Sequence, residues 1–152
     1  GHRGMPNFSR KVKLGIAQEL TEISSNIIQH SRTNDPFFVC GQYFPKKNLL
    51  NFSIVDIGVG FLPAIREKES KITDHGSAII WALESGNTTK KDVPGGLGLH
   101  NLLKYCEANN SYMQIVSGDK FWNSESMPGF TMSLGCEFAG SVINLLFSDK
   151  IR

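Results

Sequence analysis

The sequence predicts an α+β fold: a two-layer α/β sandwich with one mixed, mostly antiparallel sheet and helices on one of its faces. Three observations predict it. The chain opens with a long segment of helical periodicity, two strand-like segments follow it directly, and three more strand-like segments close the chain after several short helical ones. Such an order of helix, hairpin, helices and strands is typical of a sheet covered by helices on one side.

The first predicted helix covers residues 8–31. Its apolar side chains recur at spacings of three and four, as expected for an amphipathic helix; they are Val12, Ile16, Leu20, Ile23 and Ile27. Glu22, Asn26 and His30 follow one another at intervals of four. These three polar residues therefore form a stripe along the border of the apolar face.

The next elements predicted are a hairpin and two short helices. Strand-like segments at 37–44 and 49–57 flank the turn-forming residues Pro45–Asn48, which favours antiparallel pairing. Residues 64–68 and 77–84 have helical composition and are separated by a polar stretch. We expect two helices there.

The second half of the chain predicts a loop, a helix and three strands. Residues 86–96 combine glycine, small polar residues and charge with little to bury, which is typical of a mobile loop. A helix is expected at about 97–108. Strands are expected at 112–117, 129–134 and 141–147, separated by polar or glycine-containing turns.

Length and charge limit the functional classes. The chain has 152 residues and 40% hydrophobic content, enough for one domain. We expect residues 1–10 to be a tag or linker stub and residues 11–148 to be the domain. The 16 basic and 14 acidic residues are interspersed, which predicts neither a nucleic-acid partner nor binding to an anionic membrane.

The cysteines and the hydropathy indicate a compartment. Cys40, Cys106 and Cys136 are far apart and form no C-x-x-C pair, which argues against a disulfide framework and a zinc site. No apolar run approaches the roughly 18 residues that a membrane span requires. A reducing cytoplasm is the expected location, with no membrane span in this chain.

A carboxylate ends the second strand of the predicted hairpin. Asp56 follows an apolar run and precedes Gly58 and Gly60. A buried carboxylate needs a hydrogen-bond donor, which the exocyclic amine of adenine can supply, and glycines let the backbone approach a flat base. A strand ending in a common Asp-Gly turn would give the same pattern.

Two further motifs can serve phosphate chemistry. On the first helix, the Glu22 carboxylate can deprotonate an attacking hydroxyl or water, and the Asn26 amide oxygen can ligate Mg²⁺. The run Gly95-Gly96-Leu97-Gly98-Leu99 opens a helix whose free N–H groups attract anions. The alternatives are a solvated helix face and a flexible loop ended by a glycine turn.

In their order and spacing, the three motifs resemble the N box, G1 box and G2 box of the GHKL ATPase superfamily. That superfamily includes the ATP-binding domains of sensor histidine kinases, anti-sigma-factor kinases and gyrase-type topoisomerases. The resemblance covers about residues 12–147. It implies the Bergerat fold, Mg-ATP as the bound cofactor and an ATP lid at about 61–95.

The resemblance also implies residue roles. Glu22 would be the general base, Asn26 the Mg²⁺ ligand and Asp56 the acceptor for the adenine amine. The other residues that it places near the nucleotide are His30, Gly58, Gly60, Gly95, Gly96, Leu97, Gly98, Leu99 and Ser141. In this family, the hydroxyl that corresponds to Ser141 helps to fix the adenine-binding acid through water.

The chain also departs from the family pattern. Pro94 stands where many members have glycine, Gln29 stands where many histidine kinases have lysine, and no F box or phosphoacceptor helix is evident. These departures are more similar to anti-sigma-factor or partner-switching kinases than to a complete sensor kinase. The expected partner is a protein or a missing upstream domain that accepts the phosphate or regulates the domain, and a homodimer is left open.

Three functional interpretations remain. In the first, the domain acts in signal transduction and transfers the γ-phosphate of ATP to a partner protein. In the second, ATP orders residues 86–96 and so creates or hides a binding surface, with slow or no hydrolysis. In the third, the domain is degenerate and binds nothing, which the intact Asp56 and glycines disfavour.

Overall fold

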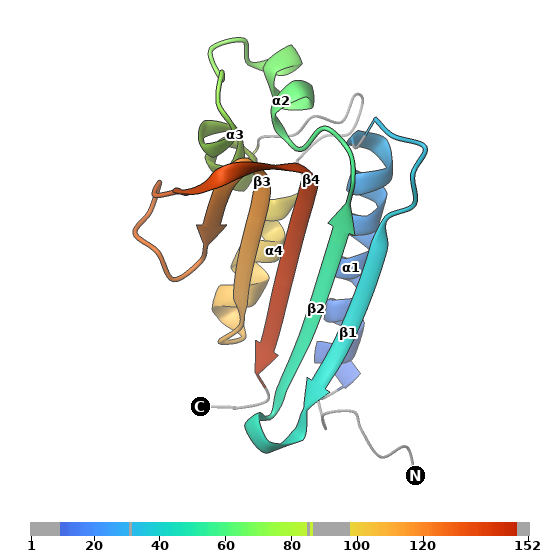
Figure 1. The fold of residues 1–152 in the computed structure, drawn as a ribbon. Helices are drawn as coiled ribbons and strands as arrows, with labels where there is room; N and C mark the ends of the chain where they lie inside the picture. Colours follow the sequence, from blue (N-terminus) through green and yellow to red (C-terminus); the bar gives the residue numbers. More distant parts are fainter. Residues whose placement is uncertain (1–9, 31, 85, 87–97, 149–152) are drawn as a thin grey trace.

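The computed structural model describes residues 10–30, 32–84, 86 and 98–148, with the backbone alone for Val12 and residues 26–30. This part of the chain is an α+β structure with four α-helices and one four-stranded antiparallel sheet (Figure 1). In chain order the elements are α1 (Arg10–His30), β1 (Phe38–Phe44), a 3₁₀ turn (Pro45–Lys47), β2 (Leu49–Asp56), α2 (Leu62–Lys68), α3 (His75–Leu83), α4 (Leu99–Ala108), β3 (Tyr112–Asn123) and β4 (Met132–Ser148).

The sheet has the strand order β1-β2-β4-β3, and each neighbouring pair is antiparallel. The sequence predicted a mixed, mostly antiparallel sheet, but every strand pair in the described part of the chain is antiparallel. The reason is that β1-β2 and β3-β4 each pair antiparallel with their neighbour in sequence, and β4 enters between β2 and β3 antiparallel to both.

Strand β4 is one long element, although the sequence predicted two strands separated by a turn. Gly135 and Gly140 within it have positive φ angles of 73° and 118°, and Gly118 of β3 has φ 57°. The register between β3 and β4 shifts next to Gly118. These glycines therefore bend a continuous strand pair, and Figure 1 shows β4 crossing above the sheet before it descends between β2 and β3.

Helices α1 and α4 lie against the same face of the sheet (Figure 1). Alternate residues of the strands point toward them. The buried side chains of this core include Ile16 and Ile23 of α1, Leu50 and Ile54 of β2, Leu102 and Cys106 of α4, Met113 and Ile115 of β3, and Ile143, Leu145 and Phe147 of β4. Burial raises the pKa of the Cys106 thiol to about 12, so this group stays protonated at neutral pH.

Helix α3 begins two residues earlier than its composition predicts because Asp74 caps it. The Asp74 carboxylate accepts hydrogen bonds from the backbone N–H of Ser77 at 2.9 Å and from its hydroxyl at 2.6 Å. These two bonds lower the pKa of Asp74. The polar stretch between the two predicted helices thus contains the N-cap of α3.

The core predicts different costs for two leucines on one strand. Leu145 is fully buried, whereas Leu134 is 40% exposed. Leu145→Ala should lower the free energy of unfolding by about 2–5 kcal/mol, because a cavity would remain in the core. Leu134→Ala, the matched control on β4, should cost less than about 1 kcal/mol. Urea denaturation measures both, and equal losses would contradict this description of the core.

Candidate functional site

Two of the predicted motifs lie at the same end of the sheet. Helix α1 ends at His30, and the chain soon enters β1 at Phe38, whose cross-strand partner on β2 is Val55. The next residue, Asp56, ends β2. The C-terminal half of α1 and the end of β2 therefore lie at the same end of the sheet, as Figure 1 shows.

The start of α4 lies at this end too. Helix α4 ends at Ala108, and after a three-residue connection Tyr112 begins β3 opposite Leu146. Leu146 also pairs with Asn51, near the start of β2. Because α4 ends near the start of β2, the N-terminus of α4 points toward the end of β2 that carries Asp56 (Figure 1).

The carboxylate of Asp56 is held from two sides. Asp56 is 3% exposed, and its cross-strand partner on β4 is Ser141, which is equally buried. The Ser141 hydroxyl donates directly to Oδ2 of Asp56, and the N–H of Gly58 donates to Oδ1 at 3.0 Å. The serine bond is direct in this structure, whereas the resemblance implied a bond through water. A carboxylate offers about four acceptor sites, so two protein donors leave capacity for another.

Two glycines near this carboxylate lie where a Cβ would come too close to a neighbouring atom. A Cβ on Gly140 would lie 2.0 Å from the carbonyl oxygen of Asp56, and its φ of 118° disfavours other residues. A Cβ on Gly60, which has φ 72°, would lie 2.7 Å from the hydroxyl of Ser117. The segment after Asp56 is thus packed tightly against β3 and β4.

A serine and a histidine that the sequence did not single out fix this segment. The fully buried Ser117 hydroxyl accepts a hydrogen bond from the N–H of Phe61 at 2.9 Å and lies 3.5 Å from Nδ1 of His75. Nε2 of His75 lies 3.9 Å from a carboxylate oxygen of Glu137. Because these residues are distant in sequence and follow no local spacing, only the fold relates them.

The side of α1 that carries Glu22 faces α4. A Cβ on Gly15 would lie 2.8 Å from the ring of Tyr105 on α4. Glu19 has a raised pKa, first because of burial and second because of the Glu22 charge, and Glu19 in turn contributes to the raised pKa of Tyr105. Glu22 is half-buried on this side. Asn26 and His30 follow it along α1, and their side chains lie outside the described part.

The glycine-rich motif is described only at its end. Gly95, Gly96 and Leu97 lie outside the described residues, Gly98 is the N-cap of α4, and Leu99 is the first residue of that helix. A Cβ on Gly98 would meet no described atom within 4 Å. The described protein contacts therefore do not by themselves require glycine at this position.

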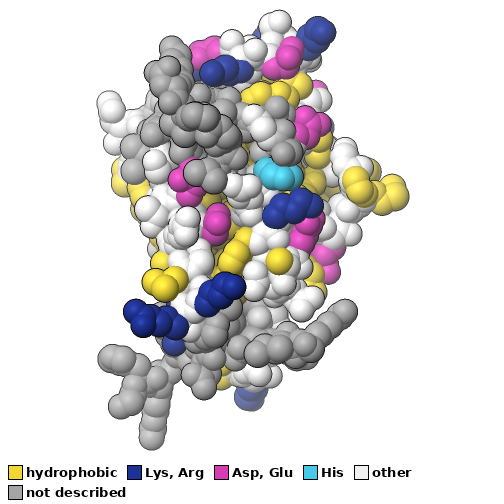
Figure 2. Space-filling view, turned by 180° about the vertical axis from the view of Figure 1, so that it is seen from behind, with side chains coloured by type: hydrophobic (Ala, Val, Ile, Leu, Met, Phe, Trp, Pro, Cys, Tyr) yellow, Lys and Arg dark blue, Asp and Glu magenta, His cyan; other side chains and the backbone are white. Residues whose placement is uncertain are grey.

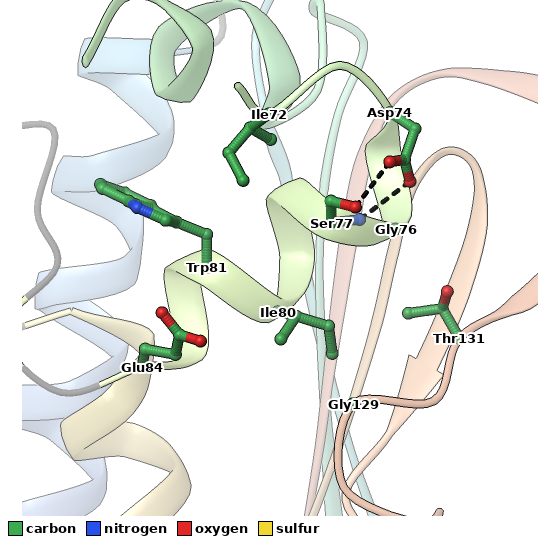
Figure 3. Close-up of a pocket in the computed structure, with 9 residues that line it drawn as sticks. All are labelled: Ile72, Asp74, Gly76, Ser77, Ile80, Trp81, Glu84, Gly129 and Thr131. Atoms are coloured by element: carbon green, nitrogen blue, oxygen red, sulfur yellow. Dashed lines mark hydrogen bonds between the residues drawn. The ribbon is translucent and has the colours of Figure 1, made fainter. Parts of the chain in front are cut away.

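A separate cavity of about 340 Å³ lies beside α3. Figure 3 shows Trp81 and Glu84 toward one end of it and Asp74 and Thr131 toward the other. None of its lining residues belongs to the three motifs, so it is a different place from the end of β2.

The described surface is mixed in charge. Figure 2 shows acidic and basic side chains interspersed over the helix-covered face, without a broad patch of one sign among the residues drawn in colour. No helix of the described ranges is long and apolar enough to cross a membrane. The described side chains also include no group of three or more His, Cys, Asp or Glu that could hold a metal ion.

The close approach of Gly140 to Asp56 gives a testable prediction. Gly135 and Gly140 both have positive φ on β4, but a Cβ on Gly135 would meet nothing within 4 Å. Gly135→Ala should therefore cost only the strain of the backbone, about 1–3 kcal/mol. Gly140→Ala adds a clash with the Asp56 backbone and should destabilise the protein clearly more. Thermal and urea unfolding of both variants measure this difference, and a loss for Gly140→Ala no larger than that for Gly135→Ala would contradict the packing described.

Comparison with known proteins gives no family assignment. A scan against protein-family models finds no match, and a search of curated proteins finds none either. The functional argument therefore depends on the residues at the end of β2 and on the helix ends that lie beside them.

Proposed function

We propose that this chain is an Mg-ATP-binding domain of the GHKL type, with the Bergerat fold, that transfers the γ-phosphate to a partner protein in cytoplasmic signal transduction. The observation that carries the proposal is the buried carboxylate of Asp56, held by Ser141 and Gly58 where β2 ends. The convergence of the α1 and α4 ends at the same place supports it (Figure 1).

The surroundings of Asp56 favour adenine as the base. Its two described donors, a hydroxyl and a backbone N–H, are neutral, and no described lysine or arginine forms an ion pair with it. A carboxylate in this state can accept a further hydrogen bond from an amine. Adenine carries an exocyclic amine where guanine carries a carbonyl oxygen. In GTP, this oxygen and the Asp56 carboxylate would both be acceptors, so no hydrogen bond could form between them. The proposal therefore includes a preference for ATP over GTP.

The helix ends suit the phosphates. The N-terminus of α4 at Gly98 and Leu99 presents N–H groups and the positive end of the helix dipole, which attract phosphate oxygens. Asn26 lies on α1, one turn beyond Glu22. When bound, Mg²⁺ would offset charge on the phosphates, with the Asn26 amide as its protein ligand. Glu22 would take the proton of the attacking hydroxyl or water.

The second candidate is an ATP-gated switch with slow or no hydrolysis. Gln29 favours it, because many histidine kinases have a phosphate-facing lysine at this position. The described part of the proposed lid limits which residues can move. Ala78 and Ile79 of α3 are fully buried, so movement of α3 would open the core. The switch hypothesis therefore concerns residues 86–96, of which only Gly86 is described.

Asp56→Asn tests the adenine site. The amide would present a donor toward the adenine amine, and an unpaired buried contact of this kind costs roughly 1–3 kcal/mol. Titration calorimetry with Mg-ATP should show at least about a tenfold loss of affinity and a reduced preference for ATP over GTP. Asp119→Asn, on the half-exposed part of β3, is the control and should bind as the wild type does. Unchanged ATP affinity in folded Asp56→Asn would refute the assignment.

Glu22→Gln tests the role of Glu22 as general base separately from nucleotide binding. The amide keeps the size of the side chain but cannot take a proton, so Mg-ATP affinity should stay near wild type while turnover falls by roughly 100-fold or more. Glu19→Gln, on the same side of α1 but about one turn farther from the end of β2, should keep turnover. The measurement follows the labelled γ-phosphate of ATP, with and without candidate partner proteins.

Two outcomes of this experiment count against the proposal. Full turnover in Glu22→Gln would remove Glu22 as the base. Fast hydrolysis without a partner, at many turnovers per second, would indicate a stand-alone ATPase and not a kinase that acts on another protein. Stable label on the partner, with none on this chain, is the expected result.

A further inference from the structure

Among the residues that the structure describes, strand β1 forms an edge of the sheet without the usual protection. Within the described part of the chain, β1 pairs on one side only, with β2. Edge strands expose backbone N–H and C=O groups that can pair with another strand, and proteins commonly block them with charges, prolines or bulges. The sequence of β1 is FVCGQYF, without a charge or a proline, and its register with β2 has no shift.

Large apolar side chains of β1 are exposed. Phe38 is 56% exposed, Val39 52% and Phe44 38%. On the sheet face away from the helices, cross-strand pairing places Phe38 at the end of an apolar row. The other members of this row are Val55 of β2, Val142 of β4 and Val116 of β3. The row is half-buried in the middle strands and ends, exposed, at the free edge.

The helix next to this edge mixes apolar, polar and basic residues on its outer side. Gly15 faces α4, so the opposite side of α1 faces the free edge of β1. Arg10, Lys13 and Ala17 lie on that opposite side and are exposed, and Leu14 and Thr21, which are also exposed, lie beside them. Figure 1 shows α1 behind β1 at this edge of the molecule. The uncharged surface at this edge is therefore that of the strand and not that of the helix.

We propose that the occupant of this edge is a second copy of the chain, with β1 pairing antiparallel to β1 about a two-fold axis at Gly41. In this register, Phe38 of one copy lies opposite Phe44 of the other, and Val39 lies opposite Tyr43. Each pair contains two apolar or aromatic residues on the same face. Gly41 meets its own copy at the axis, and the ring of Phe52 on β2 occupies the space that a side chain of Gly41 would fill.

Self-pairing is favoured because the strand is complementary to itself. In a two-fold interface, if residue i of one copy contacts residue j of the other, then residue j of the first copy also contacts residue i of the second. The aromatic residues near both ends of β1 satisfy this requirement. The pairing joins two four-stranded sheets into one continuous sheet and leaves no free β1 edge.

Sedimentation equilibrium without nucleotide tests this interface independently of the proposed function. The wild type, of 16.8 kDa per chain, should show a concentration-dependent dimer. Phe38→Lys combined with Phe44→Lys places two lysines opposite each other at both ends of the paired strands and should weaken the dimer by about tenfold or more. Phe38→Lys combined with Phe44→Glu places a lysine opposite a glutamate in the proposed register and should restore much of the dimer. Met127→Lys, at a residue 74% exposed in the connection between β3 and β4, should leave it unchanged.

Each other result overturns the proposal. A wild type that stays monomeric at all concentrations, or a dimer that survives the double lysine variant, excludes this edge as the interface. A monomeric lysine–glutamate variant excludes the register. Hydrogen exchange of the wild type needs no substitution: β1 amides should exchange more slowly where the dimer forms, and equal exchange at all concentrations would contradict the pairing.

Discussion

The hydrogen bond from Ser141 to the buried carboxylate of Asp56 is the interaction on which the candidate site depends. Burying a carboxylate is unfavourable unless donors satisfy it, and here one donor comes from β4 and the other, the N–H of Gly58, from the segment just beyond β2. Gly140 allows β4 to approach the Asp56 backbone closely enough for this contact. The position of the acid is therefore set by the pairing of β2 with β4, and not by the strand end alone.

The same pairing organises the rest of the site. Asp56 and Ser141 are 85 residues apart in sequence and become neighbours because β4 enters the sheet between β2 and β3. This order places α1 and α4 side by side on one face, with the end of α1 and the start of α4 near Asp56 (Figure 1). The proposed chemistry needs a carboxylate that binds the nucleobase, N–H groups that bind the phosphates and a helix face between them.

Local patterns predicted much of this arrangement, and long-range contacts explain what they missed. The apolar spacing of α1 and the alternation of the β1-β2 hairpin are properties of neighbouring residues, so the sequence predicts them, and Asp56 follows from the hairpin's end. The glycines at 135 and 140 instead suggested a turn, because their positive φ serves a bulge that exists only when β3 is paired. The sequence did not indicate the roles of Ser117 and His75 for the same reason: their contacts join residues about 40 to 60 positions apart.

The structure of the protein with Mg²⁺ and a non-hydrolysable ATP analogue tests the central claim most directly. The account predicts the exocyclic amine of adenine within about 3.2 Å of an Asp56 carboxylate oxygen, with the phosphates at the N-terminus of α4 between that helix and α1. A nucleotide seated elsewhere, such as in the cavity beside Trp81, or a base whose amine contacts no oxygen of Asp56, would contradict it.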